Sequence, residues 1–285
     1  MNKILKSAIA TICIIALMSS CKEPKPEIQI ISGNGHIVEE MHHCPQFSTV
    51  HVYDNFTVQI HQNEIHKIEM EGESSLLFYI DRDIANNGAL IIKTRENHVL
   101  EPTSDIVIKI YSPTTPEVIL NNNCVIYFND VHLEKCGLAL RNNAKAYFNN
   151  ANIGRINITL SNQSIVESEG LTAEIFELSA IASSKIKLKA ANFHTATIVS
   201  QSAADALLTG TCNYCTFKVK SSGDIDARDM EISHCTIAIE SSGNLYANVA
   251  NTVEGIISGS GNLYIKGDAN TNGIIIRSTG KVVPL

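Results

Sequence analysis

The sequence contains no tryptophan, and aromatic residues make up only 6% of its 285 residues. No segment shows the apolar period of an amphipathic helix. Basic residues are also scarce. Setting aside Lys3 and Lys6 leaves 20 of the 22 Lys and Arg, against 29 Asp and Glu. Nucleic-acid binding depends largely on Lys and Arg contacts with phosphate, so this acidic balance argues against a nucleic-acid partner. It also argues against peripheral binding to a membrane surface of anionic lipid.

What the sequence does have is an internal repeat. Similar short segments begin at positions 121, 141, 161, 181, 201, 221 and 241, and then, at slightly shorter intervals, at 259 and 278. A fixed period of about 20 residues is typical of a solenoid. Within each repeat, apolar and polar residues alternate, which is the period of a β-strand. We therefore expect an all-β, single-stranded parallel β-helix, right-handed, with three short strands in each coil of about 20 residues.

Equivalent positions in successive repeats predict a continuous apolar interior. One inward column reads Ile126, Ala146, Val166, Ile186 and Ala206. After residue 208 the inward positions come one residue early, as if one residue were missing between 209 and 211. Because a one-residue slip turns every side chain to the other face, we predict a local irregularity at Gly210. At the turns, we expect a hydrogen-bonded amide ladder formed by Asn122, Asn142 and Asn162.

The N-terminal segment is typical of a secretory signal. Residues 1–20 combine a basic start with an apolar stretch too short for a comfortable membrane span. Met18-Ser19-Ser20-Cys21 resembles a bacterial lipobox, which implies that Cys21 is acylated and becomes the mature N-terminus. We expect residues 21–32 to be the lipidated cysteine and a tether, and the chain to be held at a membrane of the cell envelope. The residues do not distinguish a periplasmic from a surface-exposed face, and an ordinary cleavage site before a cysteine is the alternative.

Residues 33–285 are expected to form one domain. Residues 33–120 alternate like strands but less regularly, and we interpret them as the first, irregular coils that lead into the regular coils of 121–280. No linker separates the two stretches. Residues 74–80 are expected to form a short helix or an irregular corner.

Several segments resemble the auto-transporter adhesin head domain (GIN domain) family of bacteroidete lipoproteins. The resemblance rests on GNG at 33–35, FSTV at 47–50 and NFTVQI at 55–60. It is supported by Ser-Gly-Asn or Ser-Gly-Asp turns at 222–224, 242–244 and 260–262. The early turns depart from the family pattern because they are rich in Asn. The resemblance implies adhesion and carries no catalytic residues.

The cysteines have three interpretations. Beyond Cys13 and Cys21, they are Cys44, Cys124, Cys136, Cys212, Cys215 and Cys235. Cys212, Cys215 and the pair His234-Cys235 have ligand types that suit zinc, and a disulfide is a second possibility. However, Cys136, Cys215 and Cys235 fall in one inward column, which favours packing as small buried side chains. The cluster His42-His43-Cys44 is interpreted as a polar stretch rather than a metal site.

Catalysis is an alternative hypothesis to binding on this fold. Carbohydrate-active β-helix enzymes need paired carboxylates, and the densest acidic group here is Asp224, Asp226 and Asp229 beside Arg228. No second carboxylate faces Asp226 from the next coil, so we interpret this group as a surface ion pair. We therefore expect no catalytic residue, no bound metal and no cofactor.

Outward tyrosines are the candidate ligand-binding residues. Tyr127 and Tyr147 fall on adjacent coils, and so do Tyr246 and Tyr264. Exposed aromatic faces pack against sugar rings and against protein partners, although a simple stabilising ladder is the alternative. The leading hypothesis is a non-catalytic adhesin or ligand-binding module for glycan or protein. The alternatives are a carbohydrate-active lyase or hydrolase, and a structural envelope protein that self-associates through its last coil edge (Ile274, Ile276, Val282 and Val283).

Overall fold

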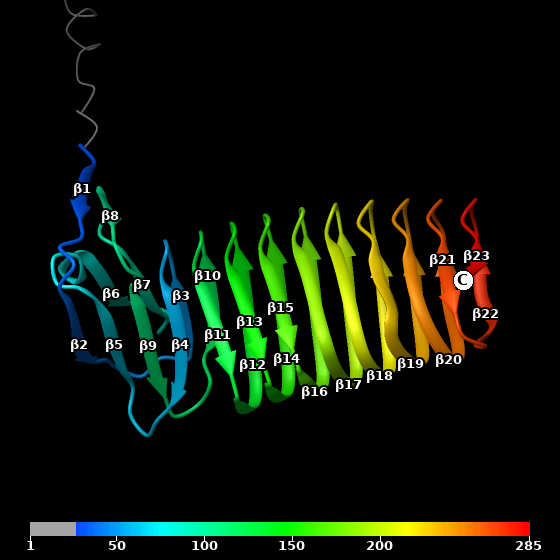
Figure 1. Cartoon of the computed structure of the whole chain (residues 1–285), viewed down its shortest axis with the longest axis horizontal. Coiled ribbons are helices and arrows are strands. Elements are labelled where there is room, and N and C mark those ends of the chain that lie inside the picture. The colour runs from blue at the N-terminus through cyan, green and yellow to red at the C-terminus, as the bar shows by residue number, and fades with distance from the viewer. Residues whose placement is uncertain (1–26) are drawn as a thin grey trace, which may run out of the picture.

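The computed structural model describes residues 27–285 and shows an elongated β-solenoid with a less regular N-terminal part at one end (Figure 1). The predicted signal peptide and Cys21 lie outside the described residues. Within residues 27–285, no helix is long and apolar enough to cross a membrane. The expected all-β architecture is confirmed.

The regular coils run from β10 to the C-terminus. They comprise β10 (Glu117–Asn121), β11 (Val125–Asn129), β12 (His132–Arg141), β13 (Lys145–Asn149), β14 (Asn152–Ser161), β15 (Ile165–Glu169), β16 (Thr172–Ile181), β17 (Lys185–Gln201), β18 (Asp205–Val219), β19 (Ile225–Ile239), β20 (Leu245–Ile257), β21 (Leu263–Lys266), β22 (Asn270–Ile276) and β23 (Val282–Pro284). Every pairing among them is parallel. The register is the predicted one, since Ile126 pairs with Ala146 and Ala146 with Val166.

Each coil contains fewer separate strands than the three expected. Early coils have a short strand of 5 residues, such as β11, and a longer one of 10, such as β12. From β17 to β20, one strand of 13 to 17 residues runs through most of the coil. The chain stays extended at the position where we expected a corner between the second and third strands of a coil. In β12 the pairing with β14 lapses only at Glu134, between Leu133 and Lys135.

Inside the coils, like side chains stack on like. Phe128 lies on Phe148 with ring centroids 4.7 Å apart, and Phe176 lies on Phe193 at 4.4 Å. At the turns, the predicted amide ladder is present: Asn162 donates to Asn142 over 2.9 Å, and Asn142 donates to Asn122 over 3.5 Å. These asparagines have positive φ, a conformation that Asn tolerates better than most residues.

The irregularity predicted at Gly210 is confirmed as a bulge. Leu188 pairs with Leu208, but the next paired position joins Ala191 to Gly210, so β17 has one more residue here than β18. Ala190 takes the extra position with φ 48°, and its N–H donates to the Thr209 hydroxyl over 3.1 Å. Gly210 has φ 122°, and a Cβ there would overlap the backbone of Ala191.

The N-terminal part pairs differently from the coils. It contains β1 (Gln29–Ser32), β2 (Ile37–His43), β3 (Thr49–Val52), β4 (Thr57–Gln62), β5 (Lys67–Glu73), η1 (Leu77–Tyr79), β6 (Ile80–Ile84), β7 (Leu90–Thr94), β8 (His98–Glu101) and β9 (Val107–Ser112). The pairs β2–β5, β5–β9 and β6–β7 are antiparallel. β3 and β4 are parallel to β10 and β11 and join this part to the first coil. The 3₁₀ helix η1 occupies the corner expected at residues 74–80.

A buried carboxylate holds the N-terminal loops together. Glu73, fully buried at the end of β5, accepts hydrogen bonds from the Thr103 N–H at 2.8 Å, the Thr103 hydroxyl at 2.9 Å and the Gly35 N–H. These bonds favour the ionised form, so the pKa of Glu73 lies below its usual value, with the Thr103 N–H as the largest cause. The side chain of Glu73 also fills the space beside Gly33.

Gly210→Ala is expected to lower the free energy of unfolding by about 2 kcal/mol or more, because alanine at φ 122° is strained and its Cβ meets backbone. Urea denaturation followed by circular dichroism measures the change. Gly137→Ala is the control, since a Cβ there meets only the flexible Glu117 side chain. Equal stability of the two variants would contradict the role assigned to the bulge.

Glu73→Gln is expected to lower the Tm at neutral pH, because the amide replaces an ionised acceptor of three hydrogen bonds. A lowered folded-state pKa stabilises the fold above the ordinary glutamate pKa, and this contribution is lost as the pH falls. The Tm difference between wild type and variant should therefore shrink as the pH falls through and below the ordinary glutamate pKa. Glu64→Gln at an exposed position serves as the control. A Tm difference that does not change with pH would refute the assignment.

Candidate tyrosine face

One outward column contains all four tyrosines singled out by the sequence. In register order it reads Tyr127, Tyr147, Glu167, Lys187, Leu207, Asp226, Tyr246, Tyr264 and Val283. We call the surface formed by this column and its flanking columns the tyrosine face. It follows β11, β13 and β15, the first segments of β17 to β20, and then β21 and β23 (Figure 1). The sequence predicted two separate tyrosine pairs, and the structure aligns them.

Each tyrosine pair is stacked. The rings of Tyr127 and Tyr147 are 5.2 Å apart at an interplanar angle of 16°, and those of Tyr246 and Tyr264 are 4.6 Å apart at 9°. Stacking follows from in-register parallel pairing, because equal residues on neighbouring strands place their side chains one strand spacing apart. Tyr127 is 41% exposed, so its pair presents ring surface and hydroxyls to solvent.

Charged groups adjoin the second pair. The Arg228 guanidinium lies 4.8 Å from the centre of the Tyr246 ring, a cation–π distance. The same guanidinium donates to both carboxylate oxygens of Asp226 at 2.9 and 2.6 Å. The expected surface ion pair is confirmed. Its hydrogen bonds lower the pKa of Asp226, so this carboxylate stays ionised, whereas a general acid needs a raised pKa.

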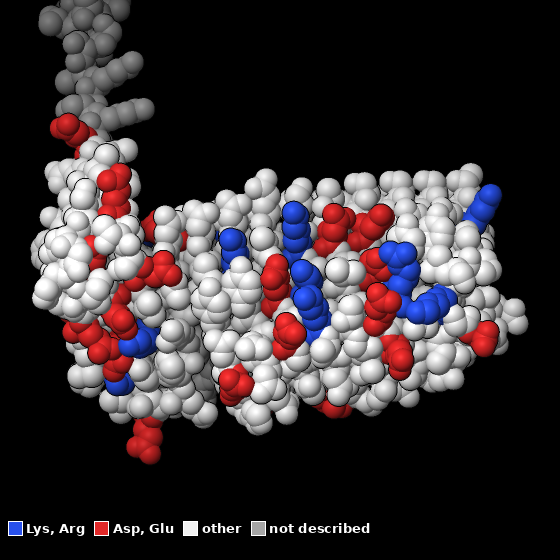
Figure 2. All heavy atoms as spheres, in the orientation of Figure 1, with Lys and Arg blue, Asp and Glu red and all other residues white. Residues whose placement is uncertain are grey.

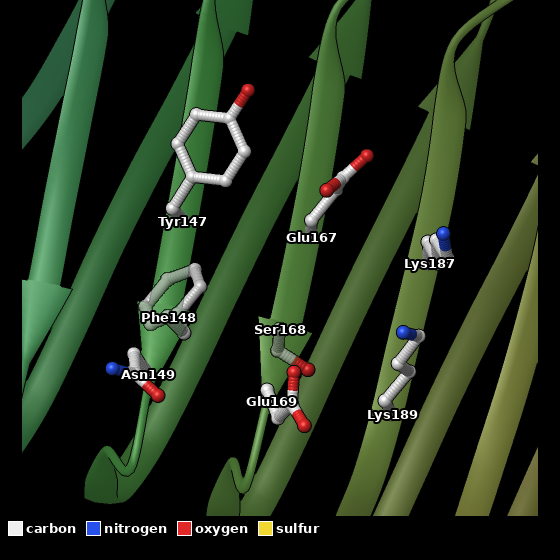
Figure 3. A pocket seen from close by; sticks show the side chains of 8 residues that line it. All are labelled: Tyr147, Phe148, Asn149, Glu167, Ser168, Glu169, Lys187 and Lys189. Carbon is white, nitrogen blue, oxygen red and sulfur yellow. The ribbon is translucent and has the colours of Figure 1, made fainter.

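Between the tyrosine pairs, the face is hollowed. A depression of about 310 Å³ is lined by Tyr147, Phe148, Asn149, Glu167, Ser168, Glu169, Lys187 and Lys189. Figure 3 shows Tyr147, Glu167 and Lys187 on three successive strands, with Asn149, Glu169 and Lys189 beside them. A second depression of about 570 Å³ follows along the face and includes Leu207 and three aspartates, Asp205, Asp224 and Asp226.

Sequence reasoning missed this charged centre. Glu167, Lys187 and Asp226 stand in the tyrosine column, but within its own coil none of them is distinctive. The repeat spacing contained the signal, and following the column through the slip at Gly210 would have joined the pairs. Asp205 was also missed. Its carboxylate accepts the Asp224 N–H over 3.3 Å, and Asp224 in turn accepts the Asn244 N–H.

The six cysteines of the described chain are free thiols, and all except Cys44 are buried. Cys215 pairs in register with Ala196 on one side and Cys235 on the other, so the predicted inward column is confirmed. Burial raises the pKa of Cys136 to about 12. Among residues 27–285, no three His, Cys, Asp or Glu side chains are grouped to hold a metal ion. The cysteines therefore pack as core side chains.

The histidine candidates also lie apart from the tyrosine face. His42 contacts Glu40 at 3.3 Å and Arg82 at 3.1 Å in the N-terminal part. His194 and His234 lie two coils apart with the Tyr214 ring between them, and Tyr214 stacks on His234 at 5.4 Å.

The last coil forms the other predicted surface. Ile274 packs partly against the core, whereas Ile275 and Ile276 of β22 are exposed, and Val282 and Val283 of β23 are half-buried. The sequence indicated Ile276 and missed Ile275. β22 and β23 are each paired with one preceding strand within the described chain.

The parallel β-solenoid presents ladders of stacked side chains on an open, shallow face. The chain belongs to the family described as "Putative auto-transporter adhesin, head GIN domain", whose model matches residues 46–269. This confirms the predicted family, and the matched range contains the FSTV and NFTVQI segments and the Ser-Gly turns.

Solved structures share the fold. A "putative adhesin" from Parabacteroides merdae is 16% identical, with a TM-score of 0.56, 90% of this chain covered and 99% of that one. A "putative adhesin" from Parabacteroides distasonis is 13% identical, also with a TM-score of 0.56, 90% of this chain covered and 100% of that one. A "Putative lipid binding protein" from the same organism is 18% identical, with a TM-score of 0.51 and the same coverage. A comparison with curated proteins finds no match.

Ser168, which lies in the depression beside Tyr147, provides a test of the stacked core. Its hydroxyl is buried without a hydrogen-bond partner, in the column that otherwise contains Phe148 and Leu188. Ser168→Ala is expected to raise the free energy of unfolding by about 1 kcal/mol, because it removes an unsatisfied buried hydroxyl. Ser164→Ala is the matched control. The Ser164 hydroxyl donates to Ser161 O at 2.6 Å, so this change should cost about 1 kcal/mol. Denaturant titration measures both free energies of unfolding. A change in the same direction for the two variants would contradict this interpretation of Ser168.

Proposed function

We propose that the protein is a non-catalytic, lipid-anchored binding module of the cell envelope that holds a glycan along its tyrosine face. The observation that carries the proposal is the alignment of Tyr127, Tyr147, Tyr246 and Tyr264 in one column. The family description as an adhesin agrees with binding and with an envelope location. The anchor rests on the lipobox at Cys21 alone.

The chemistry of the face suits sugar rings. The face of a tyrosine ring packs against the apolar face of a sugar and leaves its hydroxyl free for hydrogen bonds. Asn149, Glu167 and Asp226 lie beside or between the tyrosines and supply acceptors or donors for sugar hydroxyls. At the Tyr246 and Tyr264 pair, Arg228 lies 4.8 Å from the centre of the Tyr246 ring and places a charged hydrogen-bond donor beside the tyrosines.

The spacing favours an extended ligand. Tyr147 and Tyr246 are five coils apart in register, which corresponds to about 24 Å at about 4.8 Å per coil. Tyr127 and Tyr264 are seven coils apart, or about 34 Å. A single small sugar reaches one tyrosine pair only, whereas a chain lying along the solenoid reaches both. Weak contacts at the two tyrosine pairs then combine to give a higher affinity than either pair gives alone.

Binding is the better-supported role than hydrolysis. Hydrogen bonds from Arg228 lower the pKa of Asp226 and hold this carboxylate ionised. Asp205 and Asp224 both accept backbone N–H groups of the next coil, which accounts for them as turn supports. These contacts support the non-catalytic role that we propose, and no step of the proposal needs a cofactor.

The test is a binding screen of the soluble protein, starting after Cys21, against glycans and extracellular-matrix proteins. Tyr246→Ala/Tyr264→Ala is expected to weaken binding of the selected ligand about tenfold or more, since two stacking surfaces are lost. Tyr127→Ala/Tyr147→Ala should weaken long ligands and spare short ones. Tyr214→Ala, an exposed tyrosine in a different column, is the control.

If a ligand is found and both double variants bind it normally, the ligand site lies elsewhere on the solenoid. If wild type binds no member of the panel, the adhesin role for those ligands fails and a structural role in the envelope gains weight.

A further inference from the structure

On the tyrosine face, two acidic side chains of one strand lie beside two basic side chains of the next strand, and they form no ion pairs with each other. Glu167 and Glu169 project from β15, and Lys187 and Lys189 occupy the matching positions of β17. Figure 3 shows the four side chains on neighbouring strands. Among the described residues, none of the four forms an ion pair within 4.0 Å. Figure 2 shows acidic and basic side chains interleaved along the middle of the solenoid.

Exposed apolar groups adjoin these charges. Leu207, next in the column after Lys187, is 42% exposed, and Tyr127 at the other side is 41% exposed. The face thus combines unpaired charges of both signs with two exposed apolar side chains, an arrangement that a partner with the complementary order of charges can cover.

We propose that this part of the tyrosine face is the contact surface between two copies of the chain. A two-fold axis parallel to the strands, lying between β15 and β17, sets β15 of one copy against β17 of the other. The two solenoids then run in opposite directions, and positions along each strand stay matched. Glu167 faces Lys187 of the second copy, and Glu169 faces Lys189. Because the contact is isologous, each pair occurs twice.

The same axis matches the strands further out. β13 meets β18 of the second copy, so that Lys145 faces Asp205 and Tyr147 faces Leu207. β11 meets the start of β19, where the Tyr127 hydroxyl faces the Asp226 carboxylate. In the central column and in the column that contains Lys145 and Asp205, no two like charges oppose each other from β11 to β19. Such complementarity over six strands favours a second copy as the occupant.

The extent of the match predicts a weak dimer. β4 pairs with β11 only through Thr57 and Val58, and the sheet continues into the N-terminal part through β9. We count only the strands of the regular coils from β11 to β19. Six strands at about 4.8 Å by five residues at about 3.3 Å cover about 480 Å² on each copy. The total of about 1,000 Å² is at the lower end for specific interfaces. We expect association in the micromolar range that weakens with added salt.

The dimer covers Tyr127 and Tyr147, and the same axis places β20 and β21 of each copy opposite β4 and β9 of the other. A ligand that lies along the solenoid and reaches both tyrosine pairs therefore competes with dimerisation. The inference does not depend on glycan binding, since it rests on charge register alone.

The test is sedimentation velocity of the mature chain, residues 21–285 with Cys21→Ser, at low and high salt. Wild type should dimerise at tens of micromolar in low salt and dissociate in high salt. Glu167→Lys/Glu169→Lys and Lys187→Glu/Lys189→Glu should each weaken the dimer at least tenfold. An equimolar mixture of these two variants should form a heterodimer, because all facing charges are then opposite. The quadruple variant carrying both changes should recover the homodimer.

Lys218→Glu/Lys220→Glu, with the same two-residue spacing elsewhere on β18 and just beyond it, is the control and should dimerise like wild type. Circular dichroism confirms folding of each variant. The proposal is overturned if wild type stays monomeric at several hundred micromolar in low salt. It is equally overturned if the dimer survives both charge reversals, which would point to the edge at β22 and β23, or if the mixture fails to associate. Ligand binding by Tyr246 and Tyr264 is measured separately, so neither result decides the other.

Discussion

In-register parallel pairing between successive coils is the constraint on which the rest of this structure depends. Each coil hydrogen-bonds to the next with its side chains directly above their equivalents, so every inward or outward position becomes a column. Inside, this arrangement stacks Phe128 on Phe148 and aligns Cys215 with Cys235. At the turns, it stacks Asn142 on Asn122. A residue in such a protein is therefore constrained mainly by its neighbours one coil before and after, and much less by distant parts of the chain.

The same constraint explains why functional side chains on the outer surface are arranged in lines. Residues of one coil separated by two positions share a face, and residues one period apart share a column, so the surface has the regularity of a grid. A grid of this kind places neighbouring side chains at fixed spacings on an open surface. A grid does provide repeated platforms for an extended partner. The tyrosine face joins two aromatic platforms through a charged centre, and this arrangement serves contact along a line.

The sequence predicted the coils well because periodicity survives without tertiary information. Ile126, Ala146 and Val166 indicated their column, and the one-residue slip located the bulge at Gly210. The N-terminal part was less readable, because the antiparallel pairs β2–β5 and β6–β7 alternate in sequence just as parallel coils do. Alternation indicates which side chains lie on each face of a strand, but it does not indicate which other strand pairs with it. Glu73 illustrates the same limit. Nothing in its local sequence indicates a buried carboxylate that binds Gly35 and Thr103 from two separate loops.

For a related reason, the sequence predicted only part of the candidate site. Aromatic pairs at 127 and 147, or at 246 and 264, are visible one period apart, but the bulge at Ala190 and Gly210 breaks the count between them. The 20-residue period relates Glu167 to Lys187 and Lys187 to Leu207, whereas the step from Leu207 to Asp226 crosses the slip at Gly210. Once the column is continuous, its order matters more than its composition. Aromatic rings lie at both ends, and charges that reverse sign from one strand to the next lie at the centre. A face whose order of charges is complementary to its own reverse fits a second copy of itself.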